Sequence, residues 1–150
     1  MNTPMRIAIT GVSGRMGRML VETIDASSAT EVSAAIEREG HDWIGKDLGT
    51  ALGAAARGVV VTDNVNIALQ HSDAVIDFTA PAATIAFAQA AAEAGKIHII
   101  GTTGMTAEEI AQLDAPAERA VSVRAGNMSR GVNLLVQLTK RVAAALDDDY

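Results

Sequence analysis

The sequence predicts an α/β fold, an open and doubly wound parallel sheet with helices on both faces. Short runs of β-branched residues alternate along the chain with longer, alanine-rich runs of helical period. Apolar residues make up 49% of the 150 residues, but aromatic residues only 3%. The core must therefore be built from small aliphatic side chains, which suit buried parallel strands between helices.

Six short apolar runs are predicted to be the strands because they are rich in Val, Ile and other β-formers. They cover residues 6–10, 31–37, 58–62, 73–78, 97–103 and 120–124. His98 lies inside the fifth run, where we expect a packed or edge residue rather than a ligand.

The segments between the early strands are predicted to be helices or loops. Residues 15–25 repeat apolar side chains at spacings of three and four, which marks one helical face. Residues 39–58 are punctuated by glycines and predict a loop with a short helix. Residues 64–70 predict one or two helical turns.

Local signals mark the ends of the later helices. Pro81 begins one, since a missing N–H costs nothing at the first helical position, and Gly95 ends it. Thr106 and Glu109 form a capping box for a helix to about Leu113.

The last predicted helix covers residues 132–146. Its apolar side carries Leu135, Leu138, Val142 and Leu146. Residues 147–149 then place three acids at a helix C-terminus, which the macrodipole disfavours. We therefore expect a natural chain that continues past Tyr150.

Charge and cysteine content exclude several classes of function. Eighteen acidic and twelve basic side chains give a net charge of −6, which argues against a general nucleic-acid or anionic-membrane surface. There is no cysteine for a disulfide or thiolate site, and the three histidines lack metal-ligand spacing. We expect a cytoplasmic protein that binds no metal, nucleic acid or membrane.

A glycine-rich loop follows the first predicted strand and opens the first helix. It reads Gly11-Val12-Ser13-Gly14-Arg15-Met16-Gly17. A pyrophosphate needs N–H donors at a helix N-terminus and no side chain in its path, and the third glycine lets the helix pack close to the strand. The spacing G-x-x-G-x-x-G is less common than G-x-G-x-x-G, so the motif is only moderately specific for dinucleotides. The alternative is a tight turn between strand and helix that binds no ligand.

Two charged residues at the end of the second strand fit the dinucleotide alternative. Glu37 lies 20 residues after Gly17, where an acid reaches the adenosine ribose hydroxyls. Arg38 is able to meet a 2′-phosphate in bidentate fashion or to stack on adenine. The pair favours NADH or NADPH as the ligand; the alternative is a solvated ion pair at a strand end.

Three further stretches lie at carboxyl ends of strands, where open α/β sheets bind ligands. They are Asp77-Phe78-Thr79-Ala80-Pro81, Gly101-Thr102-Thr103-Gly104 and Ala125-Gly126-Asn127-Met128-Ser129. Phe78 is placed to pack on the nicotinamide, the second stretch offers two hydroxyls, and the third offers backbone groups to a carboxamide. Each also fits a turn held by local hydrogen bonds, and Asn127 fits a helix N-terminus.

Five motifs at matching spacings resemble the dihydrodipicolinate reductase family along the whole chain. They are residues 9–17, 37–40, 76–79, 100–104 and 127–133. The resemblance implies a Rossmann-like fold and an enzyme of diaminopimelate and lysine synthesis. Such an enzyme transfers hydride from NADH or NADPH to a cyclic, unsaturated dicarboxylate.

Carried over by position, the resemblance also assigns roles. Residues 11–16 would hold the pyrophosphate, Glu37 the ribose and Arg38 the 2′-phosphate. Residues 101–103 and 125–128 would frame the nicotinamide, and Thr103 would face the substrate as well.

The family's chains continue into a second domain with a Glu-x-His-His-x-x-Lys stretch and a later Ser-Gly-Thr, which supply the proton donor and the grip on the carboxylates. None of these occurs up to Tyr150, so we expect no catalytic residue here and cofactor binding without turnover. We assign residues 1–130 to the NAD(P)-binding domain and 131–150 to a helix leading toward the second domain. Since the family's homotetramer is built through that domain, we expect a monomeric or weakly associated chain.

Three other interpretations stay open. In the first, the chain belongs to another Rossmann-type dehydrogenase. In the second, it is a standalone dinucleotide-sensing module without chemistry, and in the third it is a folded domain without ligand. A His-His-x-x-Lys motif downstream would favour the reductase, and a natural end at Tyr150 would favour the sensing module.

Overall fold

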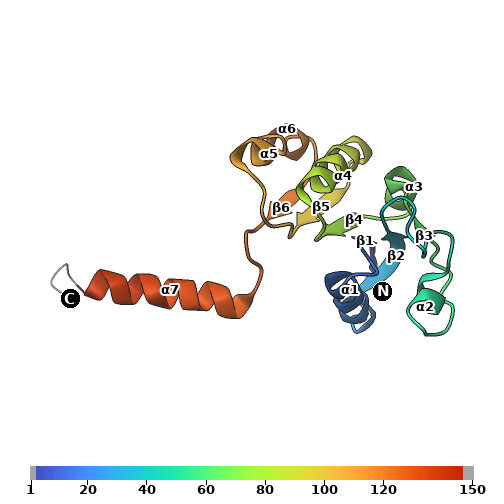
Figure 1. The fold of residues 1–150 in the computed structure, drawn as a ribbon, viewed down its shortest axis with the longest axis horizontal. Helices are drawn as coiled ribbons and strands as arrows, with labels where there is room; N and C mark the ends of the chain where they lie inside the picture. The colour runs from blue at the N-terminus through green and yellow to red at the C-terminus, as the bar shows by residue number, and fades with distance from the viewer. Residues whose placement is uncertain (1–2, 147–150) are drawn as a thin grey trace.

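The computed structural model describes residues 3–146, which form a six-stranded parallel sheet with the strand order β3-β2-β1-β4-β5-β6 (Figure 1). The strands are β1 Met5–Thr10, β2 Thr30–Ile36, β3 Val61–Thr62, β4 Ala74–Asp77, β5 Ile97–Ile100 and β6 Ser122–Arg124. The chain builds outward from β1 to β3, returns to β4 on the other side of β1, and builds outward again. This reversal between β1 and β4 confirms the predicted doubly wound sheet.

Helices cover both faces of the sheet. The helices of the described residues are α1 Arg15–Asp25, α2 Leu48–Ala51, α3 Val65–Gln70, α4 Pro81–Ala94, α5 Ala107–Ala111, α6 Asp114–Ala117 and α7 Arg130–Ala145, of which α7 lies away from the sheet. In Figure 1, α1 and α2 lie on one side of the sheet, and α3 and α4 lie on the other. Each side has its own core of small aliphatic residues, as the composition predicts: Ile9 and Val21 belong to the first, Ala34 and Leu69 to the second.

Several predicted elements have other bounds in the structure, and for three of them the local contacts are informative. The fifth strand ends at Ile100 rather than at Thr103: the Gly101 N–H still donates to the Asp77 carbonyl at 2.8 Å, but the next residue, Thr102, turns to Thr84 of α4. The third strand keeps only Val61–Thr62 in the parallel sheet, since residues 59–61 pair with the preceding loop at residues 45–48. The helix predicted to reach residue 113 ends at Ala111, and a separate turn, α6, follows.

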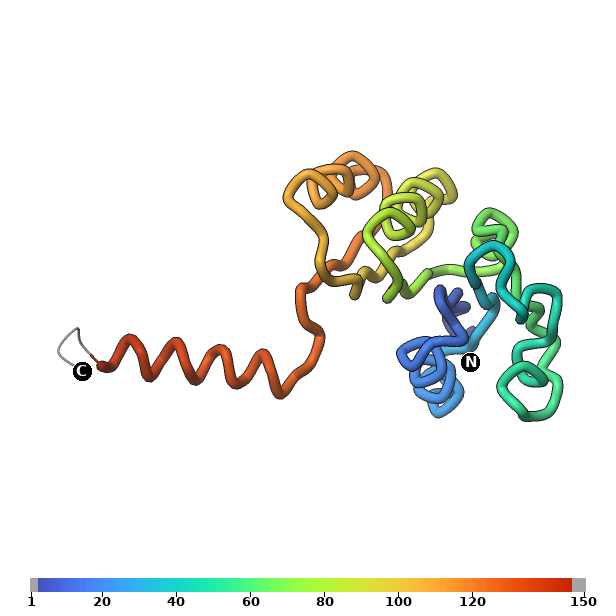
Figure 2. Tube along the Cα trace, in the orientation of Figure 1, coloured from blue at the N-terminus to red at the C-terminus, as the bar shows by residue number. Residues whose placement is uncertain are grey.

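Helix α7 confirms the helical prediction for the last segment, but no other described element packs against it closely enough to bury its residues. It leads away from the sheet after β6 (Figures 1 and 2), and none of its residues is buried. The predicted apolar stripe is exposed along its length: Leu135 is 64% exposed and Val142 58%. The acidic residues 147–149 lie outside the described residues.

Within residues 3–146, no helix combines the length and the apolar character needed to cross a membrane. The same residues hold no cluster of three or more His, Asp or Glu side chains with the arrangement of a metal site.

Gly17 is the residue on which the close packing of α1 against β1 depends. A Cβ at this position would overlap the Gly11 carbonyl oxygen and the Val12 backbone. We expect Gly17→Ala to lower the free energy of unfolding by about 1–3 kcal/mol, because backbone has to move to accept the methyl group. Gly131→Ala is the matched control in a helix, since its nearest neighbour is Ser129 Oγ at 3.9 Å. In urea denaturation, the control should change the free energy of unfolding by no more than about 0.5 kcal/mol. Equal destabilisation by Gly17→Ala and Gly131→Ala would contradict this account.

The Arg6–Asp73 ion pair fastens β1 to the turn before β4. Arg6 Nη2 lies 2.7 Å from Asp73 Oδ1, and the Arg6 backbone N–H donates to Oδ2 at 2.9 Å. These donors lower the pKa of Asp73 from 3.8 to about 2. Since the folded-state pKa is the lower one, the stabilisation is complete above about pH 4 and is lost as the pH falls toward 2.

Asp73→Asn should therefore make the free energy of unfolding fall less steeply between pH 4 and pH 2. Arg6→Met should reduce the slope over the same pH range in part, because it removes the side-chain donors to Asp73 and leaves the backbone donor. Chemical denaturation at several pH values measures the slope, and an unchanged slope in Asp73→Asn would show that the pair does not set it.

Candidate functional site

The candidate site lies along the carboxyl ends of the strands, at the point where β1 and β4 diverge to opposite sides. Ligands of open α/β sheets bind at such a switch point. Two cavities occupy this edge, one of about 590 Å³ beside β2 and one of about 300 Å³ beside β5. Phe78 and Thr79 line both cavities, so the two form neighbouring parts of one site.

The first helix presents backbone donors to this edge. Gly14 caps α1 without any side-chain cap, and Arg18 is the first residue whose N–H bonds back, to the Gly14 oxygen at 3.0 Å. Among residues 3–146, nothing accepts the N–H groups of Arg15 and Met16. The first turn also lacks acidic residues. Unpaired N–H groups and the positive end of the helix dipole form a place for an anion.

Glu37 occupies one donor of the loop itself. Its carboxylate is buried, with Oε1 accepting the Ser13 N–H at 2.8 Å and Oε2 accepting the Arg38 N–H at 3.3 Å. Arg38 is exposed and lines the same large cavity. The end of β2 thus holds a fixed carboxylate beside the glycine loop, with a guanidinium next to it.

The wall between the cavities is made by Phe78. A Cβ at Gly101 would overlap the Phe78 ring, so the ring lies directly against the loop that follows β5. This close approach requires glycine at position 101 and fixes the ring at the middle of the edge.

The two threonines after Gly101 point in different directions. Thr102 is buried, and its Oγ1 accepts the Thr84 hydroxyl at 2.7 Å and the Thr79 N–H at 3.1 Å. Thr103 is exposed at the small cavity. Of the two hydroxyls predicted to serve a ligand, the Thr102 hydroxyl is turned into the protein.

Most of the predicted site residues meet at these cavities. Those at the large cavity are Gly11, Ser13, Gly14, Glu37, Arg38 and Phe78, and those at the small cavity are Met16, Phe78, Gly101, Thr102, Thr103, Gly126, Asn127 and Met128. Asn127 also serves the turn before α7, where its Oδ1 accepts the Ser129 N–H at 2.8 Å.

Three predicted site residues line neither cavity. Val12 is fully buried in the core beneath α1, while the exposed Arg15 and the half-buried Ala125 lie beside the cavities. The Val12 side chain serves packing, and the Arg15 backbone N–H has no acceptor within residues 3–146.

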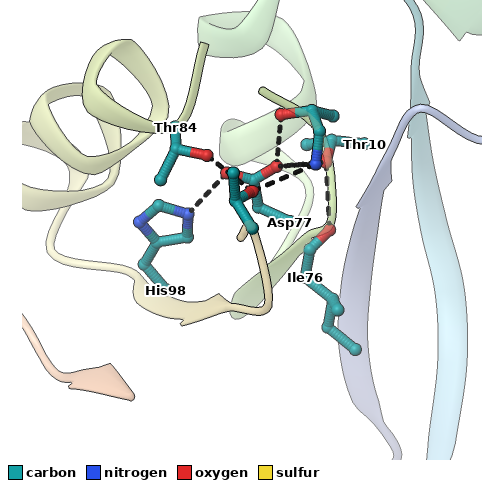
Figure 3. Close-up of polar contacts among 7 residues, drawn as sticks. Thr10, Ile76, Asp77, Thr84 and His98 are labelled. Atoms are coloured by element: carbon teal, nitrogen blue, oxygen red, sulfur yellow. Dashed lines mark hydrogen bonds and ion pairs between the residues drawn. The ribbon is translucent and has the colours of Figure 1, made fainter. Parts of the chain in front are cut away.

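Sequence reasoning missed a buried polar network beneath the site (Figure 3). Asp77, at the end of β4, is fully buried, and His98 Nε2 lies 3.5 Å from its Oδ2. Burial raises the pKa of the Asp77 carboxyl, but the surrounding donors and the imidazole outweigh this and hold the pKa below its ordinary value. A carboxylate inside an apolar strand was the signal, because such a group must find donors. His98 is packed, as expected.

Sequence reasoning also missed side chains that complete the large cavity. Ala83 and Phe87 come from the first turns of α4, and Asp63 follows β3. Thr79, which belongs to the predicted stretch at the end of β4, lines the same cavity. Ala83 and Phe87 stand four residues apart on a helix, and this spacing places them on one face.

Comparison with known proteins agrees with this geometry. Residues 5–128 match the family model described as dihydrodipicolinate reductase, N-terminus. The 4-hydroxy-tetrahydrodipicolinate reductase of Roseobacter denitrificans is 73% identical over the whole chain, which covers 55% of that protein. The reductase of Rhizobium meliloti is 45% identical over 96% of the chain, which covers 53% of that protein. The chain spans about half the length of these relatives.

Solved structures show the same fold. A dipicolinate-bound dihydrodipicolinate reductase from Paenisporosarcina sp. TG-14 superimposes with a TM-score of 0.61 at 28% identity, over 77% of this chain and 44% of that one. GenD2 of gentamicin A biosynthesis, in complex with NAD, gives a TM-score of 0.62 at 26% identity, over 85% of this chain and 36% of that one. The match of the family model and the identity to the curated reductases show that this chain, with its Rossmann-like sheet, belongs to the dihydrodipicolinate reductase family and corresponds to its N-terminal part.

Proposed function

We propose that the chain binds NADH or NADPH across the carboxyl edge of the sheet, with the pyrophosphate over the glycine loop. The observation that carries this proposal is the pair of unpaired N–H groups at Arg15 and Met16, which open onto an edge with two adjoining cavities. An anion gains most from donors that have no competing partner in the protein.

The two cavities suit the two halves of a dinucleotide. The large cavity receives the adenosine, with Glu37 accepting from a ribose hydroxyl and Arg38 beside the 2′-position. The small cavity receives the nicotinamide, framed by Thr103, Asn127 and Met128. GenD2, which has this fold, is solved in complex with NAD.

Charge in the large cavity favours NADH over NADPH. Glu37, Glu39 and Asp63 line it together with one guanidinium, that of Arg38. A 2′-phosphate gains charge-assisted hydrogen bonds from Arg38 but is repelled by three carboxylates. We infer that NADH binds at least as tightly as NADPH.

In the whole enzyme, we propose that this part delivers the hydride to a cyclic, unsaturated dicarboxylate of diaminopimelate and lysine synthesis in the cytoplasm. Hydride from the nicotinamide adds to one carbon of the unsaturated bond and a proton adds to the other. The related Paenisporosarcina reductase is solved with dipicolinate bound. The proton donor and the cationic grip on the two carboxylates belong to the other half of the full-length relatives, so this chain alone binds cofactor without turnover.

We also propose the organisation that goes with this role. Residues 1–130 form the dinucleotide-binding domain, and residues 131–150 lead toward the second domain. The exposed apolar stripe of α7 supports this assignment, because it is a surface that lacks cover within residues 3–146. By itself the chain is monomeric or weakly associated.

Calorimetric titration of the purified chain with NADH and with NADPH tests the proposal. Both should bind, and Arg38→Ala should weaken NADPH about 10–100-fold, equivalent to the ~1.5–3 kcal/mol of a charge-assisted contact, because only NADPH has the 2′-phosphate. The affinity of Arg38→Ala for NADH should differ from that of the unmodified chain by less than threefold.

Arg119→Ala is the matched control, an exposed arginine that lines neither cavity. It should leave both affinities unchanged. Equal losses for both cofactors in Arg38→Ala would remove Arg38 from the 2′-phosphate, and absence of binding by the unmodified chain would reject the function.

A further inference from the structure

Asp77 ties together the ends of two strands beneath the candidate site. Its Oδ1 accepts three hydrogen bonds: from Thr10 Oγ1 at 3.0 Å, from the Thr79 N–H at 3.0 Å and from Thr79 Oγ1 at 2.6 Å (Figure 3). Thr10 ends β1, whereas Thr79 follows β4. Three donors on one oxygen suit an ionised carboxylate, which only accepts.

A second layer joins this carboxylate to the loop after β5. The Thr79 N–H is shared with Thr102 Oγ1 at 3.1 Å, and Thr102 Oγ1 also accepts the Thr84 hydroxyl at 2.7 Å. The chain of contacts therefore runs from β1 through the turn after β4 to α4 and the loop after β5. These segments carry Phe78 and Gly101, whose close contact separates the two cavities.

The other carboxylate oxygen faces His98. Asp77 Oδ2 lies 3.5 Å from His98 Nε2, and neither atom makes a hydrogen bond within residues 3–146. Both side chains are almost completely buried, at 0% and 2% exposure. A buried carboxylate is costly unless donors offset its lost hydration, so the three donors on Oδ1 have to be held in place as long as the charge stays there.

We propose that Asp77 is a positioning residue of the dinucleotide site, whose ionised carboxylate fixes Thr79 and residues 101–103 and so sets the fit of the nicotinamide end. Asp77 lines neither cavity, and it acts through the threonines rather than on the cofactor. The inference rests on the proposed dinucleotide binding and adds a residue to it.

The network's location predicts an uneven effect on binding. Thr79 lines both cavities, but the second layer at Thr102 lines only the small one, and the donors of Arg15 and Met16 and the Glu37 carboxylate lie outside the network. A ligand that lacks the nicotinamide, such as ADP, should therefore be much less sensitive to Asp77 than NADH is. General destabilisation of the fold would weaken the binding of both ligands alike.

The test is calorimetric titration of Asp77→Asn with NADH and with ADP, at a temperature where each variant is folded by circular dichroism. The amide keeps the size of the side chain but loses the charge that holds three donors on one oxygen. We expect NADH affinity to fall at least tenfold and ADP affinity to change less than threefold.

Ser72→Ala is the matched control, because Ser72 is also buried and hydrogen-bonded, to Ala68 and Ser33, on the α3 side away from both cavities. It should leave both affinities within twofold. If Asp77→Asn does not fold, Thr10→Val decides: it removes one donor from the carboxylate, and NADH affinity should fall at least threefold.

Several outcomes would overturn the inference. The first is a folded Asp77→Asn variant whose NADH affinity is within twofold of that of the unmodified chain. The second is an equal loss of NADH and ADP affinity in that variant, and the third is an equal loss of NADH affinity in Ser72→Ala. If the unmodified chain binds NADH but the variants bind it equally well, only the role of Asp77 fails. If the unmodified chain binds neither ligand, dinucleotide binding itself fails, and the inference with it.

Discussion

The close approach of α1 to the end of β1 is the constraint on which the rest of the site depends. Only a glycine at position 17 lets the helix begin against the backbone of Gly11 and Val12. The helix therefore starts at the sheet edge rather than beyond it, and the N–H groups of Arg15 and Met16 face the same edge as the ends of β2, β4 and β5. A parallel sheet brings these ends together, since all its carboxyl termini lie on one side.

Two buried carboxylates organise this edge in different ways. Glu37 lines the large cavity and accepts an N–H of the glycine loop, so it fixes the loop and places a carboxylate at the cavity. Asp77 lies below the cavities and accepts from Thr10 and Thr79, so it links strand ends. Each accepts hydrogen bonds that offset part of the cost of burial. The site is thus preorganised by hydrogen bonds at both of its halves.

Local patterns predicted the fold and the surface of the site better than its interior. The alternation of strand and helix signals, the glycine loop and the Thr106–Glu109 capping box depend on neighbours in sequence, and all three appear in the structure. The close approach of Gly101 to Phe78, just past the end of β5, is a tertiary contact. The inward turn of Thr102 depends on Thr84, eighteen residues away. Periodicity carries no information on such contacts, and a buried Asp in an apolar strand gives only a hint of them.

The most direct measurement of the central claim is the change in backbone amide chemical shifts of the ¹⁵N-labelled chain during titration with NADH. The account predicts the largest changes at Arg15 and Met16, because a pyrophosphate accepts from these N–H groups, with smaller changes at the ends of β4 and β5. Amides near Ser72, on the α3 side, should stay unmoved. NADH binding that shifts amides elsewhere and leaves Arg15 and Met16 unchanged would contradict the account.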